Sequence, residues 1–186
     1  MVTRLVLFVG ASLVLGYVSK DSLSRPRSHG FYRLLAWESI LALVLLNFRG
    51  FATWFGDPFC LRQLVSWALL LGSIVPVSWG AHLLQTRGRP KATRDDPQLF
   101  EFEKTTQLVT AGVFKYVRHP LYSSLLLLTW GVFFKRPFGP AGGLALCATA
   151  LLTATAKTEE SENRRYFGTA YDTYMRDTKM FIPFVL

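Results

Sequence analysis

Charged and aromatic side chains that could do chemistry gather in two short segments of the sequence. Arg118 and His119 stand one turn before Tyr122, and the adjacent carboxylates Glu159 and Glu160 follow after a long apolar interval. If the two segments meet, the basic and acidic pairs either neutralise one another in an interfacial salt bridge or bind the charged groups of a ligand. Spacing alone leaves both interpretations open, so the elements that carry these residues decide between them.

Long apolar stretches carry these residues, and they predict an all-α, polytopic transmembrane helical bundle. Of the 186 residues, 51% are hydrophobic and 15% are aromatic, which is too apolar for an ordinary soluble domain of this size. A helix needs roughly 20 apolar residues to cross a bilayer. About five stretches approach this length: 2–19, 31–48, 64–84, 121–134 and 138–156. Only Lys135, Arg136 and Pro137 separate the last two, so they form a tight hairpin whose far ends bring Arg118 and Glu159 together.

The basic residues predict which side of the membrane each loop occupies. The net charge of the chain is +9. Its basic residues lie between apolar spans rather than on one soluble surface, which argues against a nucleic-acid partner. In a five-span chain, 16 of the 21 basic residues fall on one side, in 20–33, 87–118 and 157–179. The positive-inside rule makes that side cytoplasmic and places the N-terminus outside. The first stretch has no small-residue cleavage site, so we interpret it as a transmembrane helix rather than a signal peptide.

The chain is predicted to be a single integral membrane domain, residues 1–186, in two halves. The first half, 1–99, contains three spans and the basic loop 85–98. In the second half, 100–186, the mixed pattern of 100–117 predicts an interfacial helix before the fourth span. Tyr166, Phe167, Tyr171 and Tyr174 recur at helical spacing in the tail. They predict a cytoplasmic C-terminal helix that continues the fifth span and has one aromatic face.

The second half resembles a known superfamily of membrane enzymes. The order of its motifs resembles the signature of the isoprenylcysteine carboxyl methyltransferases and phospholipid methyltransferases. These motifs are the run from Gly112 to Tyr122, an apolar hairpin, Glu159-Glu160, and a tail with Gly168, Tyr171, Tyr174 and Pro183. The resemblance implies a cytoplasmic pocket for S-adenosylmethionine and methyl transfer to a lipophilic or lipid acceptor. The cofactor-binding residues that it implies are Gly112, Tyr116, Arg118, His119, Pro120, Tyr122, Glu159 and Glu160.

The residue types fit this cofactor, which carries a sulfonium cation, a ribose diol, an adenine ring and an amino acid end. Carboxylates, an arginine, a histidine and aromatic walls are all present, whereas the Gly-rich turn of soluble nucleotide-binding folds is missing. Methyl transfer from a sulfonium requires no metal. The three histidines give little support to a multi-histidine metal site, and His29 is expected to be a solvated loop residue.

The acceptor half of the signature departs from the prenylcysteine enzymes. Asp177 stands where they place an arginine for the substrate carboxylate, so the adjacent Arg176 and the intramembrane Glu38 are our candidates for catalytic residues. An aminophospholipid is then an alternative acceptor to a prenylcysteine. A sterol-reductase-like enzyme using NADPH is a second alternative, although paired carboxylates repel a 2′-phosphate. A structural or transport protein is a third. The acceptor atom and the oligomeric state are left open.

Overall fold

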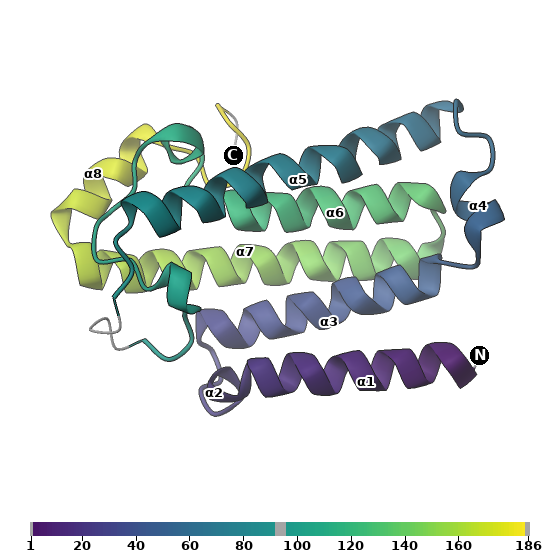
Figure 1. Ribbon diagram of the computed structural model, residues 1–186, viewed down its shortest axis with the longest axis horizontal. Coiled ribbons are helices and arrows are strands. Elements are labelled where there is room, and N and C mark those ends of the chain that lie inside the picture. The colour runs from purple at the N-terminus through teal and green to yellow at the C-terminus, as the bar shows by residue number, and fades with distance from the viewer. Residues whose placement is uncertain (1, 92–95, 185–186) are drawn as a thin grey trace.

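The computed structural model describes residues 2–91 and 96–184, and all regular elements in this part of the chain are helical. The all-α prediction is therefore confirmed. Five long helices lie side by side, with α1 at one edge (Figure 1). They are α1 (Val2–Val18), α3 (His29–Asn47), α5 (Leu61–Arg87), α6 (Pro120–Lys135) and α7 (Gly139–Phe167). The short elements are α2 (Lys20–Leu23), α4 (Phe51–Phe55), the 3₁₀ turns η1 (Glu101–Glu103) and η2 (Gly112–Lys115), and α8 (Thr169–Asp177).

The surface of the bundle is that of an integral membrane protein. Helices α3, α5 and α7 are long and apolar enough to cross a membrane, whereas α1 has 17 residues and α6 has 16. The count of about five spans, the sides of the termini and the two-part division of the domain therefore stay predictions. Helix α1 buries none of its residues, and Leu5, Leu13 and Val14 are each more than 60% exposed. Apolar side chains exposed at this density suit lipid rather than water.

Helices α3 and α7 form the centre of the bundle because small residues let them approach closely. The buried face of α7 carries Ala141, Ala145, Ala148, Leu152 and Ala156, at intervals of three and four residues. The opposing face of α3 includes Ala36, Ile40 and Leu43, which are all buried. Small side chains at such an interface favour packing between membrane helices, where the hydrophobic effect contributes little.

Helices α6 and α7 form the predicted hairpin, and α7 is much the longer arm. With 29 residues against 16, α7 extends about 43 Å and α6 about 24 Å. The last turns of α7 therefore project beyond the start of α6. Gly168 ends α7 with φ +60°, a conformation that glycine adopts without strain, and α8 then turns away from the axis of α7 (Figure 1).

The predicted interfacial helix over 100–117 is wrong. Outside η1 and η2 this segment is irregular, and part of its backbone bonds to the residue that follows α5: the amides of Thr106 and Gln107 donate to the carbonyl of Gly88. Its apolar residues Val109 and Phe114 pack against Leu83 of α5. The apolar positions at helical spacing are thus used to attach a loop to the bundle.

Candidate functional site

A pocket lies at the end of the bundle where α6 begins and α7 ends. Its wall is assembled from the end of α5, the loop before α6, the first turn of α6, the last turns of α7 and helix α8. The polar and charged lining residues are Glu103, Thr105, Arg118, His119, Tyr122, Glu159, Asn163, Tyr171 and Tyr174. Leucine, valine, proline and phenylalanine side chains form the remainder, including Leu99, Val109, Phe114 and Phe167.

The two ends of the α6–α7 hairpin meet in a buried ionic cluster. Arg118 Nε donates to Glu160 Oε1 at 2.7 Å, and His119 Nε2 lies 3.2 Å from the same oxygen. The guanidinium also donates to the carbonyls of Met175 and Thr178. The side chains of Arg118, His119 and Glu160 are less than 10% exposed. Glu160 thus neutralises the basic pair from within the protein.

Glu159 has a different environment from its neighbour. Its Oε2 accepts a 2.6 Å hydrogen bond from the Tyr122 hydroxyl and lies 3.9 Å from His119 Nδ1. The Glu159 side chain is 22% exposed and lines the pocket. Consecutive positions on a helix point about 100° apart. One carboxylate therefore completes the internal cluster and the other remains available to a ligand.

The C-terminal tail fixes the backbone of the Arg118-His119 segment. The amides of Arg118 and His119 donate to the carbonyls of Lys179 and Met180, at 2.8 and 3.2 Å. Ser123 Oγ, one turn into α6, donates to the Phe181 carbonyl at 2.8 Å. Pro120 lacks an amide hydrogen and suits the first position of α6. The basic pair is therefore positioned by segments on either side of the hairpin.

Gly112 packs the loop before α6 onto α5. Its φ is +62°, and a Cβ atom there would lie 2.6 Å from Leu83 Cδ1 and 3.2 Å from Trp79 Nε1. A side chain at this position would be both strained and crowded. The structure thus supplies a packing reason for the glycine that opens the sequence signature.

Glu103 is a pocket residue that the sequence did not identify. Its Oε2 accepts hydrogen bonds from Arg33 Nη1 at 2.9 Å and from the Phe100 amide at 3.1 Å. Burial raises the pKa of the Glu103 carboxyl, and this effect outweighs the attraction of Arg33. A glutamate in an irregular loop, paired to an arginine 70 positions earlier, gives no local sequence signal.

The two tail tyrosines form the wall contributed by α8. Tyr171 and Tyr174 are buried, their rings lie 5.8 Å apart, and the Tyr174 hydroxyl donates to the Phe114 carbonyl at 2.8 Å. Burial raises the pKa of both phenols, so both stay protonated at neutral pH. The aromatic spacing in the tail therefore marks part of the pocket wall.

Several candidate residues lie outside the pocket lining. Arg176 is exposed on α8, and Tyr116 is 44% exposed with its ring against Phe184. Glu38 faces α1, where its carboxylate accepts a 2.6 Å hydrogen bond from Ser12. Gly112 lies behind the wall, against α5. The predicted roles of these residues in catalysis or cofactor binding stay predictions.

The expectation that His29 is a solvated loop residue is wrong. It is the first residue of α3, is fully buried, and bonds through Nδ1 to Glu162 of α7. The basic loop before α3 is thus attached to the same end of the bundle as the pocket. Sequence reasoning could not find this pair because its members lie 133 positions apart.

An apolar helical bundle with a charged pocket at one end defines the class of integral membrane proteins with a polar pocket. The profile of the family described as phospholipid methyltransferase matches residues 61–170, which is more than half of the chain. The chain therefore belongs to the phospholipid methyltransferase family, within the superfamily of membrane methyltransferases that includes the isoprenylcysteine carboxyl methyltransferases. No curated protein and no solved structure matches the chain significantly.

Proposed function

We propose that this protein transfers a methyl group from S-adenosylmethionine to the amine of a membrane lipid. The observation that supports it most directly is the pocket lined by Arg118, His119, Tyr122 and Glu159, which lies inside the region that matches the family. Methyltransferases of this family generally use S-adenosylmethionine, whose sulfonium supplies an activated methyl group. The side chains that line the pocket fit the cofactor: an arginine and a histidine for its carboxylate, the carboxylate of Glu159 for its ammonium or hydroxyls, and aromatic walls for its adenine.

The contacts of the site narrow the roles of its residues. Glu160 is occupied by Arg118 and His119, so we assign it to positioning these two side chains. Glu159 and Tyr122, hydrogen-bonded to one another on the pocket side, are assigned to binding the cofactor directly. Displacement at the methyl carbon needs alignment of donor and acceptor and exclusion of water, which a pocket closed by α8 supports.

The charges around the pocket favour an amine acceptor over a carboxylate. Glu103 and Glu159 both line the pocket, and Asp177 stands where the prenylcysteine enzymes are expected to have an arginine. A protonated amine is attracted by these carboxylates but must lose its proton before its lone pair can attack carbon. Glu103 lines the pocket, and burial raises the pKa of its carboxyl, so we assign it as the candidate that accepts this proton.

The remaining alternatives receive less support from the site. A prenylcysteine carboxylate would meet Asp177 where the prenylcysteine enzymes are expected to have an arginine. The 2′-phosphate of NADPH would meet the carboxylates of Glu103 and Glu159, which argues against a reductase. A transporter would have ionisable groups at the midplane of several helices, whereas the ion pairs of Arg118 and His119 with Glu160 lie in the loop–helix junction at one end of the bundle.

Turnover by the purified protein in lipid nanodiscs tests the proposal. Labelled S-adenosylmethionine is supplied with an aminophospholipid or with N-acetyl-farnesylcysteine, and the labelled product is identified. We expect methylation of the aminophospholipid. Efficient methylation of the prenylcysteine by the wild type, without a further increase in Asp177→Arg, would contradict the amine assignment.

Calorimetric titration with the demethylated cofactor tests the pocket separately. Loss of one charge-assisted hydrogen bond in Glu159→Gln is expected to weaken binding about 10- to 100-fold, from roughly 1.5–3 kcal/mol. Asp172→Asn is the matched control, because Asp172 of α8 forms an exposed ion pair with Arg164 of α7 and does not line the pocket. Equal affinities in the two variants would refute the role of Glu159.

A further inference from the structure

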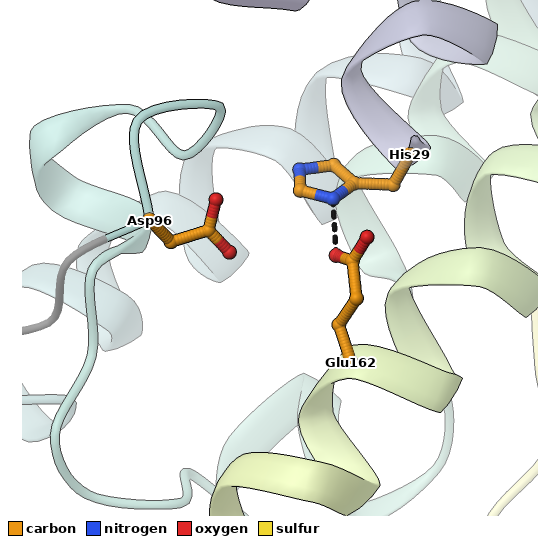
Figure 2. Close-up of side chains that lie close together, drawn as sticks. All are labelled: His29, Asp96 and Glu162. Carbon is orange, nitrogen blue, oxygen red and sulfur yellow. Dashed lines mark hydrogen bonds and ion pairs between the residues drawn. The ribbon is translucent and has the colours of Figure 1, made fainter. Parts of the chain in front are cut away.

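Three residues from distant parts of the chain meet beside the pocket. His29 opens α3, Asp96 precedes η1, and Glu162 lies in α7 one turn beyond Glu159. One nitrogen or oxygen atom from each of the three side chains lies within 4.8 Å of the other two. Figure 2 shows the three side chains grouped together. His29 is fully buried, and the two carboxylates are partly exposed. An imidazole and two carboxylates are ligand types that Zn²⁺ accepts.

The buried imidazole has one nitrogen without a partner. Nδ1 of His29 hydrogen-bonds to Glu162, whereas Nε2 is buried and has no hydrogen-bond partner among the described residues. Nε2 faces the carboxylate of Asp96 (Figure 2). A buried polar atom left without a partner has lost its hydration without gaining a hydrogen bond, which is unfavourable. The unpartnered nitrogen therefore points to a ligand between His29 and Asp96.

We propose that His29, Asp96 and Glu162 form a binding site for a divalent cation of the Zn²⁺ type. The ion is bound directly by Nε2 of His29 and by the carboxylate of Asp96, and water completes its coordination on the partly exposed side. Glu162 holds the imidazole through Nδ1, the arrangement in which a carboxylate orients a metal-binding histidine and raises its basicity. Bonds of about 2.0–2.2 Å to both groups require Asp96 to move toward His29 when the ion binds.

A cation at this position would stabilise the position of the loop that forms one wall of the pocket. Two residues after Asp96, the Gln98 carbonyl accepts a 2.5 Å hydrogen bond from Arg33 of α3, and Leu99 lines the pocket. The ion would attach this loop to the start of α3 and, through Glu162, to α7. The site is separate from the reacting groups, and we assign it a structural role in holding the loop.

Metal binding to the full-length protein in detergent tests the proposal without measuring methyl transfer, so its failure is distinguishable from failure of the proposed function. Protein purified without chelators is analysed for metal, stripped, and titrated with Zn²⁺ against a chromophoric indicator. We expect one Zn²⁺ per chain, which excess Mg²⁺ does not displace because an imidazole ligand disfavours Mg²⁺. Chelation is expected to lower the thermal midpoint of the wild type.

Single substitutions connect the binding to the three residues. Asp96→Asn and His29→Gln are expected to abolish stoichiometric binding, and Glu162→Gln to weaken it about 10- to 100-fold. Glu101→Gln is the matched control, since Glu101 is an exposed carboxylate of the same loop paired with Lys104. Asp96 is a partly exposed loop residue, so the Asp96→Asn variant is expected to fold. Thermal unfolding verifies this. Wild-type protein that binds no more Zn²⁺ than Asp96→Asn would overturn the proposal and leave His29 as a structural partner of Glu162.

Discussion

Removing the Glu160 carboxylate is expected to destabilise the protein rather than simply to weaken ligand binding. Glu160→Ala deletes the 2.7 Å bond to Arg118 Nε and the 3.2 Å contact with His119 Nε2. Breaking a buried ion pair by removing one partner costs about 3–5 kcal/mol, because the other charge is left buried. Arg118 keeps its bonds to the carbonyls of Met175 and Thr178, so we expect the lower end, about 3 kcal/mol. For a chain of this size that lowers the thermal midpoint by about 6–12 °C.

Thermal unfolding in detergent, followed by intrinsic fluorescence, measures this effect. Asp172→Ala is the control, because it removes an ion pair to Arg164 whose side chains are 57% and 40% exposed, and such pairs contribute little. The double variant Arg118→Met with Glu160→Met should recover part of the lost stability, since apolar side chains can replace both members of a buried pair, although the carbonyls of Met175 and Thr178 lose their donor. A midpoint for Glu160→Ala no lower than that of Asp172→Ala would refute the view that this cluster is a buried structural element.

Three further predictions follow from other parts of the structure. The raised pKa of Glu103 means that the folded state binds more protons than the unfolded state between pH of about 4.3 and the folded-state pKa. This group's contribution to stability therefore falls as the pH rises through that range. The thermal midpoint of the wild type relative to that of Glu103→Gln should decrease as the pH rises, and a constant difference would contradict this prediction. Gly112→Ala should cost about 1–3 kcal/mol in thermal unfolding, whereas Gly10→Ala, which contacts nothing within 4 Å, should be neutral or stabilising. In a chain lacking Cys60 and Cys147, single cysteines introduced at Thr86 and Arg176 should show the same labelling by an impermeant reagent in intact cells. A cysteine introduced at Phe59 should show the opposite labelling. Equal labelling at all three positions would refute the predicted topology.

The sequence determined the kind of protein because its signals are local and repetitive. Each of the five predicted apolar stretches falls on one of the long helices, although α7 continues beyond its stretch to Phe167. A helix satisfies its own backbone hydrogen bonds, so an apolar stretch can form one without other elements. The short link at 135–137 made a hairpin the only connection available and brought Arg118 to Glu160. The ordered signature around Arg118, His119, Glu159 and Glu160 indicated the family that the profile match confirms.

Only the tertiary structure decided what each member of the signature contacts. Adjacent carboxylates look equivalent in a sequence, yet helix geometry turns Glu160 to the buried Arg118 and leaves Glu159 on the pocket. The sequence pattern of 100–117 predicted a helix, but the segment forms an irregular loop because its apolar residues pack against α5 and two of its amides bond to Gly88.

Long-range pairs were equally invisible in the sequence. Glu103 with Arg33, and His29 with Glu162, join residues 70 and 133 positions apart, and no local periodicity records such a contact. Composition and spacing define elements whose hydrogen bonds close within a few residues. The positions where separate elements meet depend on the packing of the whole bundle, and that packing placed the pocket wall and the cluster around His29.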